Sequence, residues 1–244
     1  MKTRILGTAS VIVLAVVVVL GLWVTGPDVN QGQHVRLLYV HPEVAWVAYV
    51  AFAITSLASV LWLIPATRRH VFDHLAGASA EIGSVFIALT LVTGAIWGRP
   101  TWGTWWSWDP RMTTTLMLLM LYLGVLALRR LPATFEARAR RSAFAALMAF
   151  LGVPIVHQSV VWRRSLHQAP SILKPDITKP LIHGLQLWTM LLSFIGFTMV
   201  YVWLLIMRTR LARWDDEAGD KTLVDAIAAR RAEATSGTFA QVSS

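Results

Sequence analysis

The sequence predicts an all-α integral membrane protein, a six-helix bundle capped at its outer face by three loops. Composition is the first reason, because 56% of the 244 residues are apolar, only 14% are charged, and the mean hydropathy is +0.57. A helix needs about 20 apolar residues to cross a bilayer. Six runs approach that length, near residues 5–25, 41–64, 75–97, 112–129, 142–162 and 181–207. They lack the alternation of polar and apolar residues that a membrane β-barrel needs.

The first run follows the basic start "MKTR", which is typical of signal peptides as well as of first membrane spans. Its end, "VVLGLWVTGPD", offers no small-x-small cleavage motif. We therefore expect residues 5–25 to be retained as the first span.

Lysine and arginine are distributed unequally between the two sides of a chain with six spans. The richer side carries Lys2, Arg4, Arg68, Arg69, Arg129, Arg130, Arg138, Arg140, Arg141, Arg208, Arg210 and Arg213. The poorer side carries Arg36, Arg99, Arg111, Arg163, Arg164, Lys174 and Lys179. Because cytoplasmic loops collect Lys and Arg, the richer side and both termini are expected to be cytoplasmic. The net charge of +9 then reflects membrane orientation, and no nucleic-acid partner is expected.

The chain divides into a membrane domain at residues 1–207 and a cytoplasmic tail at residues 208–244. Within the tail, residues 221–234 have the apolar spacing of an amphipathic helix that lies on the membrane surface. The last ten residues are small and polar, which predicts disorder. Three connections are expected to face outward and to form the cap, near residues 26–40, 97–112 and 163–180.

Five of the seven histidines map to the outward connections or to the outward ends of spans: His34, His41, His157, His167 and His183. His70 and His74 lie in a basic linker on the other side and are expected to be solvated surface residues. The chain has no cysteine, so a transition metal on the outward face would need imidazole ligands. The spacings H-x-x-x-H and H-E-x-x-H are absent from the outward histidines, which argues against a hydrolytic zinc site.

The second outward connection, "WGRPTWGTWWSWDPRM", places Trp102, Trp105, Trp106 and Trp108 within seven positions. One interpretation is an aromatic belt, in which tryptophans anchor helix ends at the lipid headgroups. The other is a platform for a flat apolar ligand that contains iron. Indole rings can pack on a porphyrin while imidazoles bind the iron and arginines meet the propionates. The residues by themselves leave both interpretations open.

The run "WGRPTWGTWWSWDPR" resembles the WWD signature of the haem-handling proteins of cytochrome c maturation. The length and the flanking motifs are most similar to those of the CcmC family, haem exporter protein C. In that family two outward histidines flank the WWD loop and act as axial ligands of the haem iron. The segment "YVHPEVAWVAY" places His41 on the first ligand position, and "PIVHQSVVWRRSLHQ" places His167 on the second.

The sequence departs from the family pattern near both ligands. Pro42-Glu43 replaces the usual Val-Pro after the first histidine, and Arg163 follows the tryptophan of the second motif where a further tryptophan is usual. No role is carried over to His34 or His183, which match no position of the pattern.

The resemblance implies a haem transport and transfer protein of a bacterial cytoplasmic membrane rather than an enzyme. It would bind haem b without a covalent bond, and membrane lipid would surround its spans. The implied partners are ABC transporter subunits like CcmA and CcmB, a small subunit like CcmD, and a haem chaperone like CcmE. The expected haem-binding residues are His41, His167, Trp102, Trp105, Trp106, Trp108, Asp109, Arg99 and Arg111.

Two alternative functions come from other classes of membrane protein. A membrane b-type cytochrome would carry electrons through haem, but its ligands would be expected within the spans rather than at one face. A generic ABC permease subunit would show polar groups along a path through the membrane. Glu81 is the main isolated intramembrane charge that could support the second alternative.

Overall fold

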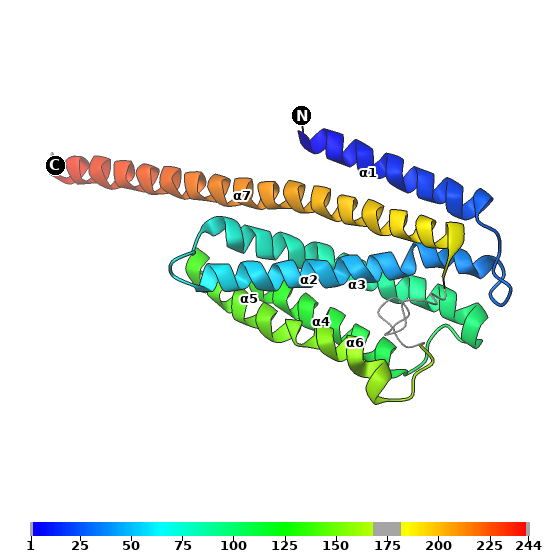
Figure 1. Ribbon diagram of the computed structural model, residues 1–244. Helices are drawn as coiled ribbons and strands as arrows, with labels where there is room; N and C mark the ends of the chain where they lie inside the picture. Colours follow the sequence, from blue (N-terminus) through cyan, green and yellow to red (C-terminus); the bar gives the residue numbers. More distant parts are fainter. Residues whose placement is uncertain (1, 168–181, 243–244) are drawn as a thin grey trace.

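The computed structural model describes residues 2–167 and 182–242, and these residues form a helical bundle (Figure 1). The elements are α1 Lys2–Val19, η1 Leu20–Val24, η2 Gln33–Tyr39, α2 His41–Leu63, α3 His70–Trp102, α4 Pro110–Arg130, α5 Phe135–Phe150, α6 Gly152–Trp162 and α7 Gly184–Val242. Six helical segments are long and apolar enough to cross a membrane: Thr3–Val24, Gln33–Leu63, His70–Trp102, Pro110–Arg130, Phe135–Trp162 and Gly184–Arg231. The predicted six-span helical class is confirmed.

The fifth span consists of two helices, α5 and α6, which meet at Leu151. Pro154 explains the break, because its nitrogen carries no hydrogen for the helix ladder and its ring crowds the carbonyl of Phe150. The sequence predicted one uninterrupted helix over 142–162, because apolar composition alone does not indicate where a helix breaks.

We call the end of the bundle where α3 turns into α4 the loop end, and the opposite end, which carries Arg129 and Arg130 at the close of α4, the basic end. Helix α7 begins at the loop end and projects beyond the other helices past the basic end (Figure 1). The sequence predicted a short helix over 221–234 and a disordered end, whereas the helix continues to Val242. Alanine, glutamate and arginine dominate residues 226–234, which favours continuation.

The bundle is built around α2 and α3, which form its most extensive helix pair. Their backbones approach closely at Gly83, where a β-carbon would lie only 2.6 Å from the Phe52 ring. Phe52 in turn stacks on Tyr122 of α4, with ring centroids 3.6 Å apart. Small residues of this kind allow helices to pack inside a membrane. Helix α1 stands to one side and packs mainly against α7.

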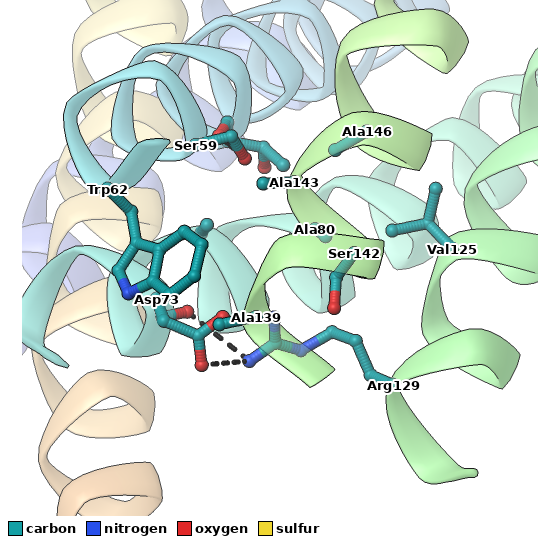
Figure 2. A pocket seen from close by; sticks show the side chains of 12 residues that line it. Ser59, Trp62, Asp73, Ala80, Val125, Arg129, Ala139, Ser142, Ala143 and Ala146 are labelled. Atoms are coloured by element: carbon teal, nitrogen blue, oxygen red, sulfur yellow. Dashed lines mark hydrogen bonds and ion pairs between the residues drawn. The ribbon is translucent and has the colours of Figure 1, made fainter. Parts of the chain in front are cut away.

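A buried charge network ties four helices together near the basic end. Arg129 of α4 donates two hydrogen bonds to the Asp73 carboxylate of α3, at 2.7 and 2.9 Å (Figure 2). Arg138 of α5 joins Asp73 to Asp216 of α7, which also accepts a 2.7 Å hydrogen bond from Nε2 of His74. His74 is only 5% exposed, so the prediction of a solvated surface histidine is wrong there. His70 is exposed as predicted, whereas Asp73 and His74 are buried because α4, α5 and α7 pack over this side of α3.

A small cavity lies beside this network, between Trp62, Arg129 and the alanines of α5 (Figure 2). Its volume is about 10 Å³, which is room for about one water molecule. The cavity is therefore a packing defect next to a structural ion pair and cannot hold an organic ligand.

Candidate functional site

His41 is the first residue of α2 and lies at the loop end, where its ring is held by α3. Its Nδ1 atom is 3.0 Å from Oγ1 of Thr93. The Thr93 hydroxyl has one hydrogen and donates it to the carbonyl of Leu89, at 2.8 Å. With its proton directed at that carbonyl, the hydroxyl oxygen accepts from Nδ1–H in the tautomer of His41 that carries its hydrogen on Nδ1. This arrangement leaves the lone pair of Nε2 as the group that can bind a metal.

Two further residues of α3 shape the position of this imidazole. A β-carbon on Gly94 would lie 3.0 Å from Cε1 of His41, so the glycine makes room for the ring. Trp97 packs edge-on against His41, with ring centroids 5.7 Å apart, and its indole nitrogen donates to Gln31. The ring of His41 is thus fixed both by a hydrogen bond and by packing.

His167 is held by Asp109, which directly precedes α4 and ends the tryptophan loop, as we call the connection between α3 and α4 together with Trp102. Nδ1 of His167 lies 3.0 Å from Oδ1 of Asp109, and Oδ2 accepts from Oγ of Ser165 and from the backbone N–H of Leu166, both at 2.7 Å. Asp109 also caps α4, because Oδ1 accepts the N–H of Arg111 at 2.9 Å. The Asp109 carboxylate therefore caps the start of α4 and holds the segment that follows α6. It also orients the His167 ring through Nδ1, which leaves Nε2 of His167 out of this hydrogen bond.

Burial and hydrogen bonding act in opposite directions on Asp109. Burial raises the pKa of the carboxyl, but hydrogen bonds from Ser165, Leu166 and Arg111 outweigh it, so the pKa lies below its ordinary value. For His167 burial lowers the pKa; Asp109 opposes this effect and the charge of Arg111 adds to it, with a net lowering. The carboxylate is thus ionised and the imidazole neutral at neutral pH, which is the state that binds iron.

Both histidines and Arg111 gather at the loop end although they come from three separate parts of the chain. His167 and Arg111 both lie close enough to His41 to interact with it electrostatically. Helix α3 reaches both rings, since Trp97 packs against His41 and Trp102 packs edge-on against His167 at 4.7 Å between ring centroids. The predicted grouping of His41, His167, Trp102, Asp109 and Arg111 therefore has a common location in the fold.

The other three tryptophans of the loop do not pack on either histidine in the described part of the chain. Trp105 is 58% exposed and Trp108 is 76% exposed. Trp106 is half-buried and meets Trp108 edge-on at 5.6 Å. Trp108 also stands at the head of an apolar groove between α4 and α5. These indoles form a surface next to the site rather than a wall around the imidazoles.

Arg99 lies on the exposed side of the loop and caps its own helix. Its guanidinium donates to the carbonyl of Gly103, the residue that ends α3 in the left-handed conformation with φ 79°. Glycine adopts this conformation without strain. The predicted contact between Arg99 and a propionate remains a prediction.

The side chains of the remaining outward histidines, His34, His157 and His183, are exposed. The backbone carbonyl of His157 nevertheless accepts a 3.4 Å hydrogen bond from the guanidinium of Arg111. Among residues 2–167 and 182–242, no group of three or more His, Asp or Glu side chains could hold a bare metal ion. Glu43 is fully buried and neither of its oxygens has a hydrogen-bond partner in the described chain, so it does not orient His41.

Sequence reasoning missed the residues that support the two rings: Thr93, Gly94, Trp97 and Ser165. A signal existed in "TGAIW", because Thr93 and Trp97 are four residues apart and share a helix face with a glycine beside them. Only the pairing of α2 with α3 reveals that this face meets His41. The predicted third connection falls mostly on residues 168–181, outside the described residues.

The six spans define a class, a multi-pass helical membrane protein, and two histidines with engaged Nδ1 atoms lie at one end of its bundle. The match to known families agrees with this class. Residues 2–223 match the model of the CcmC family, heme exporter protein C, and the chain belongs to that family.

Several relatives cover most of the chain. Heme exporter protein C of Haemophilus influenzae is 38% identical over 213 residues, which are 86% of this chain and 83% of the relative. Heme exporter protein C of Escherichia coli strain K12 is 36% identical over 211 residues, covering 84% and 81%. A putative cytochrome c biosynthesis ccmC-like mitochondrial protein of Marchantia polymorpha is 34% identical over 196 residues, covering 80% and 81%.

Proposed function

We propose that this protein holds haem b, without a covalent bond, at the outward end of its membrane bundle and passes it on during cytochrome c maturation. His41 and His167 are the two axial ligands in this proposal. The observation that carries it is the convergence of two imidazoles whose Nδ1 atoms are both engaged, so that both Nε2 atoms remain for iron. Membership of the heme exporter protein C family supports haem as the cargo.

The surrounding residues have separate roles in this proposal. Trp102 lies against His167 and would contact one edge of the macrocycle. The exposed loop surface formed by Trp105, Trp106 and Trp108 would cover its face or meet the acceptor. Asp109 orients His167. Arg111 and Arg99 are the cations available for the propionates.

Orientation and partners follow from charge and family. The basic end would be cytoplasmic and the loop end would face outward, because Lys and Arg concentrate at the former. A multi-pass protein in the cytoplasmic membrane of a bacterium would work there with ABC subunits like CcmA and CcmB, with a small subunit like CcmD, and with a haem chaperone like CcmE. Its task would be transfer rather than catalysis.

Two observations favour this function over the alternatives. Glu81, the main intramembrane charge that could support a permease, forms an ion pair with Arg208 of α7 at 2.5 Å, which accounts for it structurally. The candidate iron ligands lie together at the loop end, whereas a b-type cytochrome that moves electrons across the bilayer would place them within its spans. A redox titration coupled to a quinone would separate the cytochrome from the transfer protein.

The direct test of ligation compares four histidine variants of the purified, haem-loaded protein. His41→Ala and His167→Ala should each abolish the bis-imidazole optical spectrum. His34→Ala and His183→Ala are matched controls at the same end of the bundle and should leave it unchanged. If the spectrum survives both of the first two substitutions, the ligand assignment is wrong.

The role of the tryptophan loop is tested by transfer. Truncation of Trp105 and Trp106 to alanine should lower the amount of haem retained or the rate at which a chaperone domain receives it. Membrane insertion should be normal, because both side chains lie outside the spans. If both the haem content and the loading of the chaperone are unchanged, the loop tryptophans are better explained as an aromatic belt that anchors helix ends in the lipid.

A further inference from the structure

The two candidate axial histidines differ in the group that accepts a hydrogen bond from Nδ1. His41 donates to the hydroxyl of Thr93 and His167 donates to the carboxylate of Asp109, and both distances are 3.0 Å. Because the distances are equal, the difference between the two rings lies in the charge of the acceptor. That charge affects how strongly Nε2 of each ring binds iron.

The environment of His41 makes it the weaker electron donor. Thr93 is neutral, and its hydroxyl proton is already committed to Leu89, so it can only accept from the ring. The permanent charge that acts on His41 is that of Arg111, and it is positive. A nearby positive charge draws electron density away from the imidazole, which weakens its bond to iron.

The environment of His167 has the opposite effect. The Asp109 side chain is only 2% exposed, so water screens its negative charge little. A buried carboxylate that accepts from Nδ1–H pushes electron density into the ring and makes Nε2 more basic. Arg111 acts on His167 as it does on His41, and therefore does not remove the difference between them.

We infer that His167 is the retained axial ligand and that His41 is the exchangeable one. The inference rests on the proposed function, in which both rings bind one iron. During transfer the bond between iron and Nε2 of His41 breaks, and a ligand of the acceptor forms a bond at the vacated position. Nε2 leaves as a neutral nitrogen with its electron pair, so the exchange needs neither a proton nor a change in the oxidation state of the iron. Haem stays attached through His167 until the acceptor holds it.

The first experiment measures how much ferric haem b each ligand variant of the full chain retains in lipid nanodiscs. His41→Ala should keep haem after gel filtration, as a high-spin species with His167 as its protein ligand in the electron paramagnetic resonance spectrum. His167→Ala should lose most of its haem. Free imidazole added to His41→Ala should fill the vacant position and restore the low-spin signal.

The second experiment changes the acceptors and leaves the ligands intact. Asp109→Asn keeps the helix cap, since Asn caps as well as Asp, but removes the charge. Haem should leave this variant for excess apomyoglobin roughly 10–100-fold faster, the usual cost of losing an outer-shell partner. Thr93→Val should have a much smaller effect. Thr93→Asp places a carboxylate next to Nδ1 of His41. This variant should slow the rate at which cyanide replaces His41 on the haem iron.

The outcomes separate the inference from the function on which it rests. If neither histidine substitution alters the spectrum, the proposed ligation itself fails. If both alter the spectrum but retain the same amount of haem, the ligation stands and the asymmetry is overturned. If Asp109→Asn and Thr93→Val accelerate haem loss equally, the asymmetry is also overturned. Such a result would mean that the charge of the residue that accepts from Nδ1 has no effect.

Discussion

Replacing Asp109 by alanine should release the segment that carries His167 from the tryptophan loop. The carboxylate accepts hydrogen bonds from Ser165, Leu166 and His167. A hydrogen bond to a charged group contributes roughly 1.5–3 kcal/mol net. The three bonds are not additive, because water replaces part of what is lost when the segment opens, so we take roughly 3 kcal/mol as the loss. Since each 1.4 kcal/mol is about a factor of ten, the open population should rise by about 100-fold.

Limited trypsin digestion measures this opening directly. Arg163 and Arg164 are exposed and directly precede the fastened segment, and cleavage follows the population of the open form when opening is fast. Cleavage after these arginines, quantified by mass spectrometry, should accelerate by up to about 100-fold in Asp109→Ala, in line with that loss of hydrogen bonds. Asp28→Ala is the control, because Asp28 accepts two backbone hydrogen bonds at 2.8 Å in another connection at the loop end. Equal cleavage rates in Asp109→Ala and the unaltered protein would refute the reasoning.

Three further predictions concern packing and charge. Asp73→Asn should lower the free energy of unfolding in detergent by about 3 kcal/mol, because it leaves the mostly buried Arg129 of α4 without its carboxylate partner. Glu217→Gln, at an exposed ion pair, should cost under about 1 kcal/mol, and equal losses would contradict the burial argument. Gly83→Ala should cost about 1–3 kcal/mol by overlap with the α2 core, whereas Gly124→Ala, which faces open space, should be neutral or stabilising in the same denaturation assay. Gly94→Ala should displace the α2 histidine and reduce haem bound per protein, and a haem content equal to that of Gly124→Ala would contradict the predicted contact.

The spans were predictable because the bilayer imposes both length and apolar composition on them, and six runs met both conditions. Their limits were less predictable. Helix α3 starts at His70, five residues before the apolar run at 75–97, and His70 stacks on Phe135 of α5 while His74 donates to Asp216 of α7; composition alone does not reveal these contacts. The break at Leu151 was present in the sequence as Pro154 but was hidden by the apolar character of the whole run.

The candidate ligands His41 and His167 were accessible from sequence because they occupy recognisable motifs. Their supporting residues were not accessible in the same way. Thr93 matters only because α2 and α3 pack in one register, and Asp109 acts on His167 across a separation of 58 residues. Composition predicted a shared role for Trp102, Trp105, Trp106 and Trp108, yet of these four only Trp102 packs against a candidate ligand.

A density map of the haem-loaded protein would show the proposed ligation directly. We expect one macrocycle at the loop end, with its iron between Nε2 of His41 and Nε2 of His167 and with Trp102 against the second ring. Asp109 and Thr93 should still accept from the two Nδ1 atoms. Haem density elsewhere, such as in the groove between α4 and α5, or iron bound by any other side chain, would show that His41 and His167 are not the axial ligands.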